Sequence, residues 1–470
     1  MNRKTLIVCS RPRLGAAPRT RLPVVPIMAA LFVMPSFCCA QQGTGAGTEA
    51  PAALDAAARE AVIDAVTSKV EELYVFPDVG KKICEQMRSR QRDGAYARIE
   101  SLDELTRQIT RDLQSASSDK HIGVLVLDER LAGSHHVATE DDDEWWEQYL
   151  AETRRTNFGF ARAECLGGNV GYLKLTSFEF PRAAGPTAVG AMSFLANCEA
   201  LIVDVRDNYG GRDEMIQLLL SYLFEDAVHF ATKIHRDRDA QQQRWTIPFV
   251  PGRKLVEIPL YVLVGRDTVS GGEAFAYFLQ SLKRATVIGE NTVGAAHMTH
   301  PHPLPDLGIV VFVPDGTTTC PATGTDWNGT GVKPDISVPA DQALRVAHIE
   351  ALKLGLRGET DEKARFDKEW LLRGLEASQD PITLSDTQLK EYVGSFGDRR
   401  FRVEEGRLIY QRGGRSEFFM IPLGEDLFRL EGLEPDYLRF QFNRDKTGAI
   451  TEVVALYDDR NREAIRRTGK

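Results

Sequence analysis

The segment Ala200-Leu-Ile-Val-Asp-Val-Arg206 is almost entirely apolar and predicts a buried β-strand that stops at Asp207-Asn208-Tyr209-Gly210-Gly211. Further along, Leu260-Tyr-Val-Leu-Val264 predicts a second buried strand. That strand leads through Gly265-Arg-Asp-Thr-Val-Ser270-Gly271-Gly272 into a helical pattern. Continuous apolar strands that alternate with helices are typical of an α/β sandwich, and this is the fold class that we expect here.

Ser270 lies where the second strand gives way to the helix. A serine in this position can attack a carbonyl carbon, and the free N–H groups and positive dipole at the start of a helix stabilise nearby negative charge. The same position also suits a plain helix N-cap, and Glu273 three residues later completes a capping-box pattern. Ser270 is therefore a candidate nucleophile with a helix cap as the alternative, and we interpret Glu273 as structural.

The glycines around these two turns are candidates for an oxyanion hole. Gly210 and Gly211 follow the first strand, and Gly271 follows the serine. Glycine lets the backbone approach a ligand closely and turn its N–H inward. An ordinary strand-to-helix turn is the alternative for the pair, and we place Gly210 and Gly271 ahead of Gly211 as donors.

Several stretches of the chain together carry a family resemblance. They are Val170-Gly-Tyr-Leu-Lys-Leu-Thr-Ser177, Leu201 to Gly211, Thr268-Val-Ser-Gly-Gly-Glu-Ala-Phe-Ala-Tyr277, Arg284-Ala-Thr-Val-Ile-Gly-Glu290 and Gly329-Thr-Gly-Val-Lys-Pro-Asp335. In this order they resemble the tail-specific, C-terminal-processing serine peptidases. The similarity is greatest to the branch that includes interphotoreceptor retinoid-binding protein and the tricorn-type core, and Asp119-Lys120-His121 also resembles that branch.

The resemblance implies a core like that of the crotonases and the Clp protease. It implies a serine-type peptidase that acts on a peptide or protein substrate and needs no cofactor or metal. Ser270 would attack the scissile carbonyl, and one N–H from the glycine loop and one from the residue after the serine would bind the oxyanion.

The general base is the least certain part of the expected mechanism. Many family members use a lysine after the serine, but Ala295 occupies that position here, so a Ser–Lys dyad is not expected. Resemblance to the tricorn-type branch points to His121 as the base, and an imidazole suits that role near neutral pH. His297 is the second choice, and it begins a run with His300 and His302 that we expect to form a loop.

One position departs from the family pattern. Asn328 stands where the family places a glutamate that orients the catalytic residues. Asparagine can form hydrogen bonds but carries no charge, so Asp326 is a possible substitute. Ser118, close to His121 in the sequence, is a further candidate for orienting the imidazole, with a simple turn residue as the alternative.

The main alternative to an enzyme is a non-catalytic ligand-binding or carrier protein on the same fold. Retinoid-binding relatives show that this core can carry a ligand, and a fold does not fix a function. A crotonase-type enzyme that acts on acyl-CoA is a third alternative. The chain also shows no recognisable separate peptide-binding module between His121 and Val170, so recognition of C-terminal carboxylates is not expected.

Composition and charge limit the possible partners. The 470 residues have 43% hydrophobic side chains and a net charge of −9. The first forty residues contain six basic and no acidic side chains, so the remainder has a net charge of −15. An acidic protein of this kind is unsuited to nucleic acid or to an anionic membrane surface.

The N-terminus has the pattern of an export signal. A basic lead precedes the apolar segment Leu22 to Phe37, which three prolines interrupt and which is too short to span a bilayer. We expect cleavage after Cys38-Cys39-Ala40 and a periplasmic or extracellular protein, with lipid attachment and a misassigned start codon as alternatives. Of the cysteines beyond the signal, Cys84, Cys165, Cys198 and Cys320, no pairing can be ranked from sequence, and free thiols are equally expected.

The predicted organisation has six parts. They are a signal peptide (1–40), a flexible spacer (41–56), an N-terminal helical cap (57–120), an α/β peptidase core (121–345), a helical linker (346–380) and a β-rich C-terminal domain (381–470). Residues 130–160 are expected to be a connection or a lid over the cleft. The C-terminal domain shows short alternating strands separated by glycine turns, which favours a small antiparallel β domain with a binding or scaffolding role.

Overall fold

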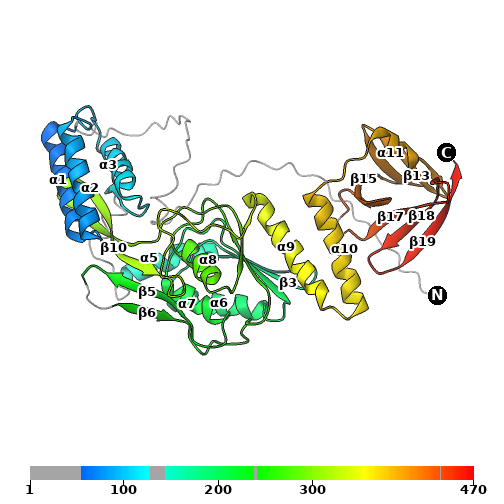
Figure 1. Ribbon diagram of the computed structural model, residues 1–470, viewed down its shortest axis with the longest axis horizontal. Coiled ribbons are helices and arrows are strands. Elements are labelled where there is room, and N and C mark those ends of the chain that lie inside the picture. Colours follow the sequence, from blue (N-terminus) through cyan, green and yellow to red (C-terminus); the bar gives the residue numbers. More distant parts are fainter. Residues whose placement is uncertain (1–53, 128–142, 238–240, 434–435, 470) are drawn as a thin grey trace. The chain divides into compact units, whose positions relative to one another are not determined.

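The computed structural model describes residues 54–127, 143–237, 241–433 and 436–469. The predicted signal peptide and nearly all of the spacer lie outside these ranges, as do residues 130–142 of the expected connection. The described residues form N-terminal helices, a mixed α/β core and a C-terminal antiparallel barrel (Figure 1). The predicted fold class is therefore confirmed. None of the helices in the described ranges combines the length and apolar character needed to cross a membrane.

The N-terminal helices are α1 (Ala56–Leu73), α2 (Pro77–Arg92) and α3 (Leu102–Ser117). Two of them begin at side-chain caps, because Asp55 accepts the N–H of Ala58 at 2.8 Å and Ser101 accepts that of Glu104 at 3.2 Å. Pro77 begins α2 at a position where its missing N–H costs nothing. The buried faces of the helices share one hydrophobic core with strands β1 and β10 of the smaller sheet.

The smaller sheet contains β1 (Gly123–Val126), β10 (Ile309–Thr319), β5 (His229–His235) and β6 (Gln242–Trp245) in that order, and β9 (Met298–Leu304) pairs with β10. All of these pairs are antiparallel. The expected loop with His300 and His302 is thus the edge strand β9, and this part of the prediction was wrong. The prolines Pro301 and Pro303 argued against a strand in the sequence. Proline has no N–H to donate to a neighbouring strand, so within a sheet it occurs mainly on edge strands.

The larger sheet has the order β11-β8-β7-β4-β3-β2. Its strands are β11 (Ile336–Ser337), β8 (Thr286–Gly289), β7 (Leu260–Val264), β4 (Ala200–Asp204), β3 (Val170–Leu175) and β2 (Phe160–Leu166). All neighbours are parallel except β2 and β3. The two quoted segments are therefore adjacent strands, β4 and β7, in the middle of this sheet.

Helices cover both faces of the larger sheet (Figure 1). On one face lie α6 (Pro181–Phe194), α7 (Asp213–Ser221) and α8 (Gly271–Ser281), and on the other lies α9 (Ala340–Arg357). Alternate residues of β4 divide between the two cores, with Leu201 and Val203 facing α6–α8 and Ile202 facing α9. Burial on both faces explains why β4 and β7 are continuously apolar.

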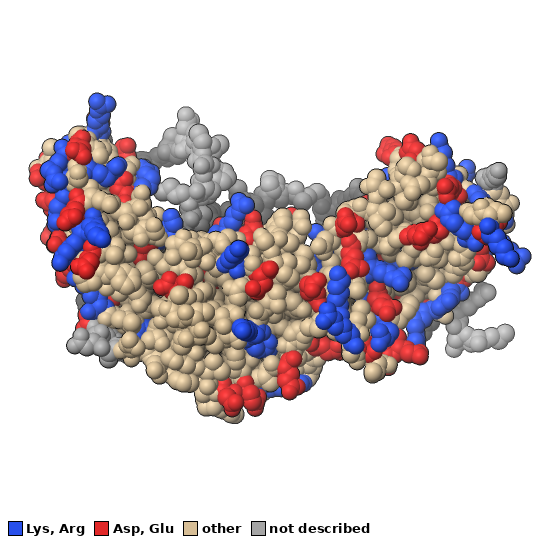
Figure 2. Space-filling model, viewed as in Figure 1, with Lys and Arg blue, Asp and Glu red and all other residues tan. Residues whose placement is uncertain are grey.

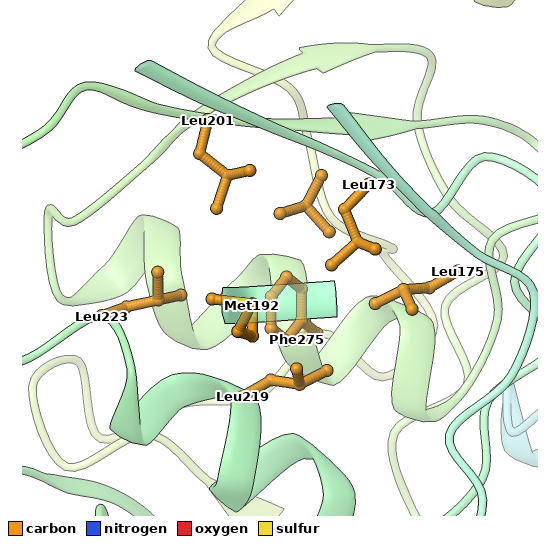
Figure 3. Close-up of a pocket in the computed structure, with 8 residues that line it drawn as sticks. Leu173, Leu175, Met192, Leu201, Leu219, Leu223 and Phe275 are labelled. Carbon is orange, nitrogen blue, oxygen red and sulfur yellow. The ribbon is translucent and has the colours of Figure 1, made fainter. Parts of the chain in front are cut away.

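A small pocket lies within the first of these cores, and Figure 3 shows the side chains around it. Its volume is about 10 Å³, and its lining is entirely apolar: Leu173, Leu175, Met192, Leu201, Val203, Leu219, Leu223 and Phe275. A space of this size holds one water at most, and the lining offers no hydrogen-bond partner to hold it. It is a packing defect of the core and is separate from the candidate site.

The expected helical linker (346–380) is formed by two helices, α9 and α10 (Glu362–Gln379). The Asp361 side chain caps the second helix, because it accepts the N–H of Ala364 at 2.8 Å. Helix α11 (Asp386–Glu391) then leads into a closed antiparallel barrel. The barrel strands are β12 (Gly394–Phe396), β13 (Arg399–Glu404), β14 (Arg407–Arg412), β15 (Glu417–Gly424), β16 (Leu427–Leu430), β17 (Leu438–Arg444), β18 (Ile450–Tyr457) and β19 (Arg462–Gly469). Closure leaves no exposed sheet edge, and buried phenylalanines fill the interior.

Candidate active site

Ser270 occupies a strained turn between β7 and α8. Its backbone has φ +55° and ψ −118°, a conformation that residues other than glycine rarely adopt. The side chain is half-buried, and the Ser270 N–H donates to the Glu273 carboxylate at 2.9 Å. Strain of this kind persists only where the surroundings enforce it, and it is common at functional residues.

The glycine loop after β4 lies directly against this serine. Gly210 and Gly211 both have positive φ, at +99° and +131°. A Cβ added to Gly210 would lie 2.8 Å from Ser270 Cβ and 3.2 Å from its Oγ. A Cβ added to Gly271 would lie 3.0 Å from the Gly211 nitrogen. The structure therefore brings all four predicted residues together, and only glycine fits at position 210.

Asn208 organises this contact, and our sequence interpretation gave it no role. Its fully buried side chain accepts the Gly210 N–H at 2.8 Å and donates to the Leu175 carbonyl at 3.1 Å. Its own carbonyl accepts the Val269 N–H at 3.0 Å, next to the serine. Because Asn208 already takes the Gly210 N–H, the exposed Gly211 is better placed to donate to a ligand than the sequence-based ranking assumed.

Glu273 connects the serine turn to the loop after β8. Besides the Ser270 N–H, its buried carboxylate accepts the Thr292 hydroxyl at 2.5 Å and the N–H groups of Gly294 and Ala295 at 2.6 and 2.9 Å. Burial raises the pKa of Glu273, and these hydrogen bonds oppose the rise. The predicted capping box is present, which confirms the structural interpretation of Glu273, and the same carboxylate also holds together two loops of the candidate site.

Asp119 joins both candidate histidines. Its Oδ2 lies 2.5 Å from His297 Nδ1 and accepts the Tyr74 hydroxyl at 3.3 Å, while its Oδ1 accepts the backbone N–H of His121 at 3.0 Å. Asp119 is fully buried, and both histidine side chains are nearly so. One signal for this carboxylate was visible in the sequence, its place two residues before His121, but we assigned it no role.

The two histidines differ in their surroundings. Both ring nitrogens of His297 face carboxylates, since Nε2 lies 3.8 Å from Asp326 Oδ2. The His121 imidazole is buried next to the backbone of His297, and burial lowers its pKa, whereas the charge of Asp119 opposes that change. Burial therefore disfavours the charged form of His121, whereas the ring of His297 lies between two carboxylates.

Asn328 lies beside the loop that contains Ala296 and His297. Its N–H donates to Asp326 Oδ1 at 2.8 Å, and its own Oδ1 accepts the Ala296 N–H at 3.4 Å. The next residue, Gly329, lies close to Ser118, because a Cβ added there would be 3.3 Å from the Ser118 carbonyl oxygen. Asn328, Asp326 and Ser118 thus all lie around the histidine cluster.

His300 and His302 stand apart from this cluster on β9. His300 Nδ1 lies 2.8 Å from Asp315 Oδ2, and this contact raises the pKa of His300. The pKa of His302 is lowered, mainly by burial. Neither residue belongs to the groups around Ser270 or Asp119 that the preceding contacts define.

The geometry follows from the topology. Strands β4, β7 and β8 are neighbours in one parallel sheet. The glycine loop follows the carboxyl end of β4, the serine turn follows that of β7, and the loop whose N–H groups bind Glu273 follows that of β8. Ligand sites of open α/β sheets form at this edge. The position suits acyl-transfer chemistry, because a nucleophile and backbone donors meet at turns that follow the strands of a rigid sheet.

Two models of one family match this chain. Residues 169–338 match peptidase family S41, and residues 53–151 match the N-terminal domain of family S41 peptidases in eukaryotic IRBP. Together the matches span more than half of the 470 residues. The first includes the glycine loop, the serine and Asn328, and the second includes Asp119 and His121.

Individual relatives match over shorter stretches. Carboxyl-terminal-processing peptidase 2, chloroplastic, of Arabidopsis thaliana is 32% identical over 36% of this chain and 32% of its own length. A carboxyl-terminal-processing protease of Picosynechococcus is 27% identical over 37% of this chain and 40% of its own length. The chain thus spans about a third of the length of such curated relatives.

Among solved structures, the photosystem II D1 C-terminal processing protease aligns with 60% of this chain and 94% of its own, at 16% identity and a TM-score of 0.38. The tricorn protease aligns with 68% of this chain and 37% of its own, at 13% identity and a TM-score of 0.39. The two family matches, which fall in order along the chain and contain the candidate site, decide the assignment: the chain belongs to the tail-specific peptidases of family S41.

Proposed function

We propose that the protein is a serine peptidase with Ser270 as its nucleophile. The observation that carries this proposal is the contact between Gly210 and Ser270, where a Cβ on the glycine would lie 2.8 Å from the serine Cβ. It sets the serine beside the N–H groups of Gly211 and Gly271. Backbone donors at such a position can stabilise the oxyanion that forms when a serine attacks a peptide carbonyl.

His121 serves as the general base in this proposal. Its lowered pKa supports the role, because only the neutral imidazole can accept the serine proton. His297 stays the second choice: a carboxylate 2.5 Å from its Nδ1 also suits a catalytic imidazole, and its Nε2 lies 3.8 Å from Asp326 Oδ2. We assign His297 and Asp119 to positioning the segment that contains His121.

Asn328 replaces the family glutamate as a neutral hydrogen-bonding group. Its Oδ1 accepts the N–H of Ala296, the residue before His297, and its N–H engages Asp326. Asp326 supplies the negative charge near the imidazoles that Asn328 lacks. The site in this proposal is therefore a serine, a histidine and supporting carboxylates, without the family lysine, since Ala295 stands at that position.

The substrate class is a peptide or protein, and the protein is exported. Export is supported by the basic and apolar pattern of residues 1–40. On the face drawn in Figure 2, acidic and basic side chains are interspersed, so this face presents no basic patch of the kind that binds nucleic acid.

Labelling with a fluorophosphonate probe tests the proposal. The folded wild-type chain should be labelled at Ser270, and Ser270→Ala should lose both the label and peptide hydrolysis, by roughly 10⁴-fold or more, with an unchanged circular dichroism spectrum. If the folded wild-type protein does not react, the alternative of a ligand carrier on the same fold replaces the peptidase. If Ser270→Ala hydrolyses the peptide as fast as the wild-type protein does, Ser270 is not the nucleophile.

A further inference from the structure

Two cysteines approach one another at the edge of the larger sheet. Cys165 is exposed on β2, and Cys198 is buried in the turn between α6 and β4. Their sulfur atoms are 3.5 Å apart, which is within contact distance although the residues are 33 positions apart in the chain. Cys198 lies just before β4, and β3 lies between β4 and β2 in the sheet, so the two sulfur atoms meet across the end of β3.

A glycine makes room for this approach. Gly171 on β3 is the direct cross-strand partner of Cys165. A Cβ at position 171 would lie 3.2 Å from Cys198 Sγ, closer than almost all observed contacts of this kind. Cys198 therefore fills the space that a side chain at position 171 would occupy. This packing explains why a glycine stands inside the buried strand β3.

The other two cysteines of the described residues lie elsewhere. Cys84 belongs to the core of the N-terminal helices, where its thiol donates to the Thr67 carbonyl at 3.2 Å. Cys320 is fully buried just after β10, and its backbone pairs with that of Thr325 in an isolated antiparallel β-bridge. The structure thus ranks the possible pairings, which the sequence alone could not do.

We propose that Cys165 and Cys198 are the site of an intramolecular disulfide. The bond forms by exchange with a small disulfide such as oxidised glutathione. The Cys165 thiolate attacks that disulfide and releases one glutathione thiolate, which takes up the proton that Cys165 lost. Cys198 then loses its proton and attacks the Cys165 sulfur, which forms the Sγ–Sγ bond and releases the second glutathione. The two protein thiols are oxidised, and one small disulfide is reduced to two thiols.

The environments of the two thiols set the order of these steps. Cys165 is accessible to a reagent, whereas burial and the neighbouring Cys165 raise the pKa of the Cys198 thiol to about 12. Cys165 is therefore the entry point, and Cys198 is the residue that resolves the mixed disulfide. The cross-link would tie edge strand β2 to the segment that enters β4, the strand that leads into the glycine loop.

Oxidation of the reduced, folded full chain with oxidised glutathione tests this assignment. After alkylation and digestion, mass spectrometry should find the Cys165 and Cys198 peptides joined, with the loss of two hydrogen atoms. The melting temperature should rise by roughly 5 °C or more, because the cross-link restricts the unfolded chain. A stable glutathione adduct on Cys165 with Cys198 still free, or a link that includes Cys84 or Cys320, would overturn the proposal.

Two variants with a matched control complete the test. Cys165→Ser and Cys198→Ser should each abolish the rise in melting temperature on oxidation while folding normally under reducing conditions. Cys84→Ser, which removes a buried thiol outside the pair, should retain the rise. If the oxidised wild-type protein melts at the same temperature as oxidised Cys165→Ser, the two thiols are not joined.

Discussion

The two halves of the candidate site are assembled in different ways. The half with Ser270 and the glycines comes from turns that follow adjacent strands of one parallel sheet, β4 and β7. The half with the histidines depends on a contact between Asp119 and His297, which are 178 positions apart, and on Tyr74 from the N-terminal helices. The nucleophile turn is thus a local structure, whereas the candidate base depends on contacts between distant segments.

The largest expected effect separates the two histidines. If His121 is the base, His121→Ala should lower kcat/KM on the order of a hundred- to ten-thousand-fold, as loss of a general base does. His297→Ala should cost far less, because in our proposal it only helps to position the neighbouring segment. Steady-state kinetics of both variants, with folding checked by circular dichroism, make the comparison. A reversed order of severity would assign the base to His297.

The next largest effect tests the link between the two halves. Glu273→Gln should lower kcat roughly 10- to 100-fold with little change in KM, because the amide group would turn a donor toward N–H groups that need an acceptor and would shift the Ser270 turn. The matched control is Glu290→Gln, which removes a carboxylate paired at 3.0 Å with the exposed Arg266. Equal kinetics in the two variants would reduce Glu273 to a helix-capping residue.

The pH dependence of kcat/KM tests how burial affects the pKa of His121. Burial lowers its pKa, so the acid limb of kcat/KM should lie below about 6.5, the usual value for histidine. The sign follows from the chemistry: protonation removes the base, so activity falls as pH drops through the pKa. Asp119→Asn should move the limb to still lower pH, because the aspartate charge favours the imidazolium. A limb at or above 6.5 would contradict the effect of burial.

The smallest effect concerns the C-terminal barrel. A chain that ends at Ser385 should remain folded and keep kcat/KM within a few-fold, because the barrel closes around its own aromatic core. The contact most affected is that of Trp370 in α10, which donates to the Asp436 carbonyl and stacks against Arg439 at 3.9 Å. Aggregation of the shortened chain, measured by gel filtration, would show that the barrel is needed to cover α10.

Much of the fold and half of the site could be predicted from the sequence. The apolar run before Gly210 and the helical pattern after Ser270 identify two buried strands and the turns that follow them. These features depend on hydrophobic periodicity and turn chemistry, which act between residues close in the chain. The C-terminal β domain was predicted for the same reason.

The remaining features depend on contacts between segments that are distant in the sequence. Strand order placed β4 next to β7, and that neighbourhood let Asn208 take the Gly210 N–H and leave Gly211 exposed. Packing of the N-terminal helices against β1 and β10 buried Asp119 beside His297. Hydrogen bonds and ion pairs of this kind depend on which segments meet in space. A buried carboxylate requires such partners, but its sequence position does not reveal which residues supply them.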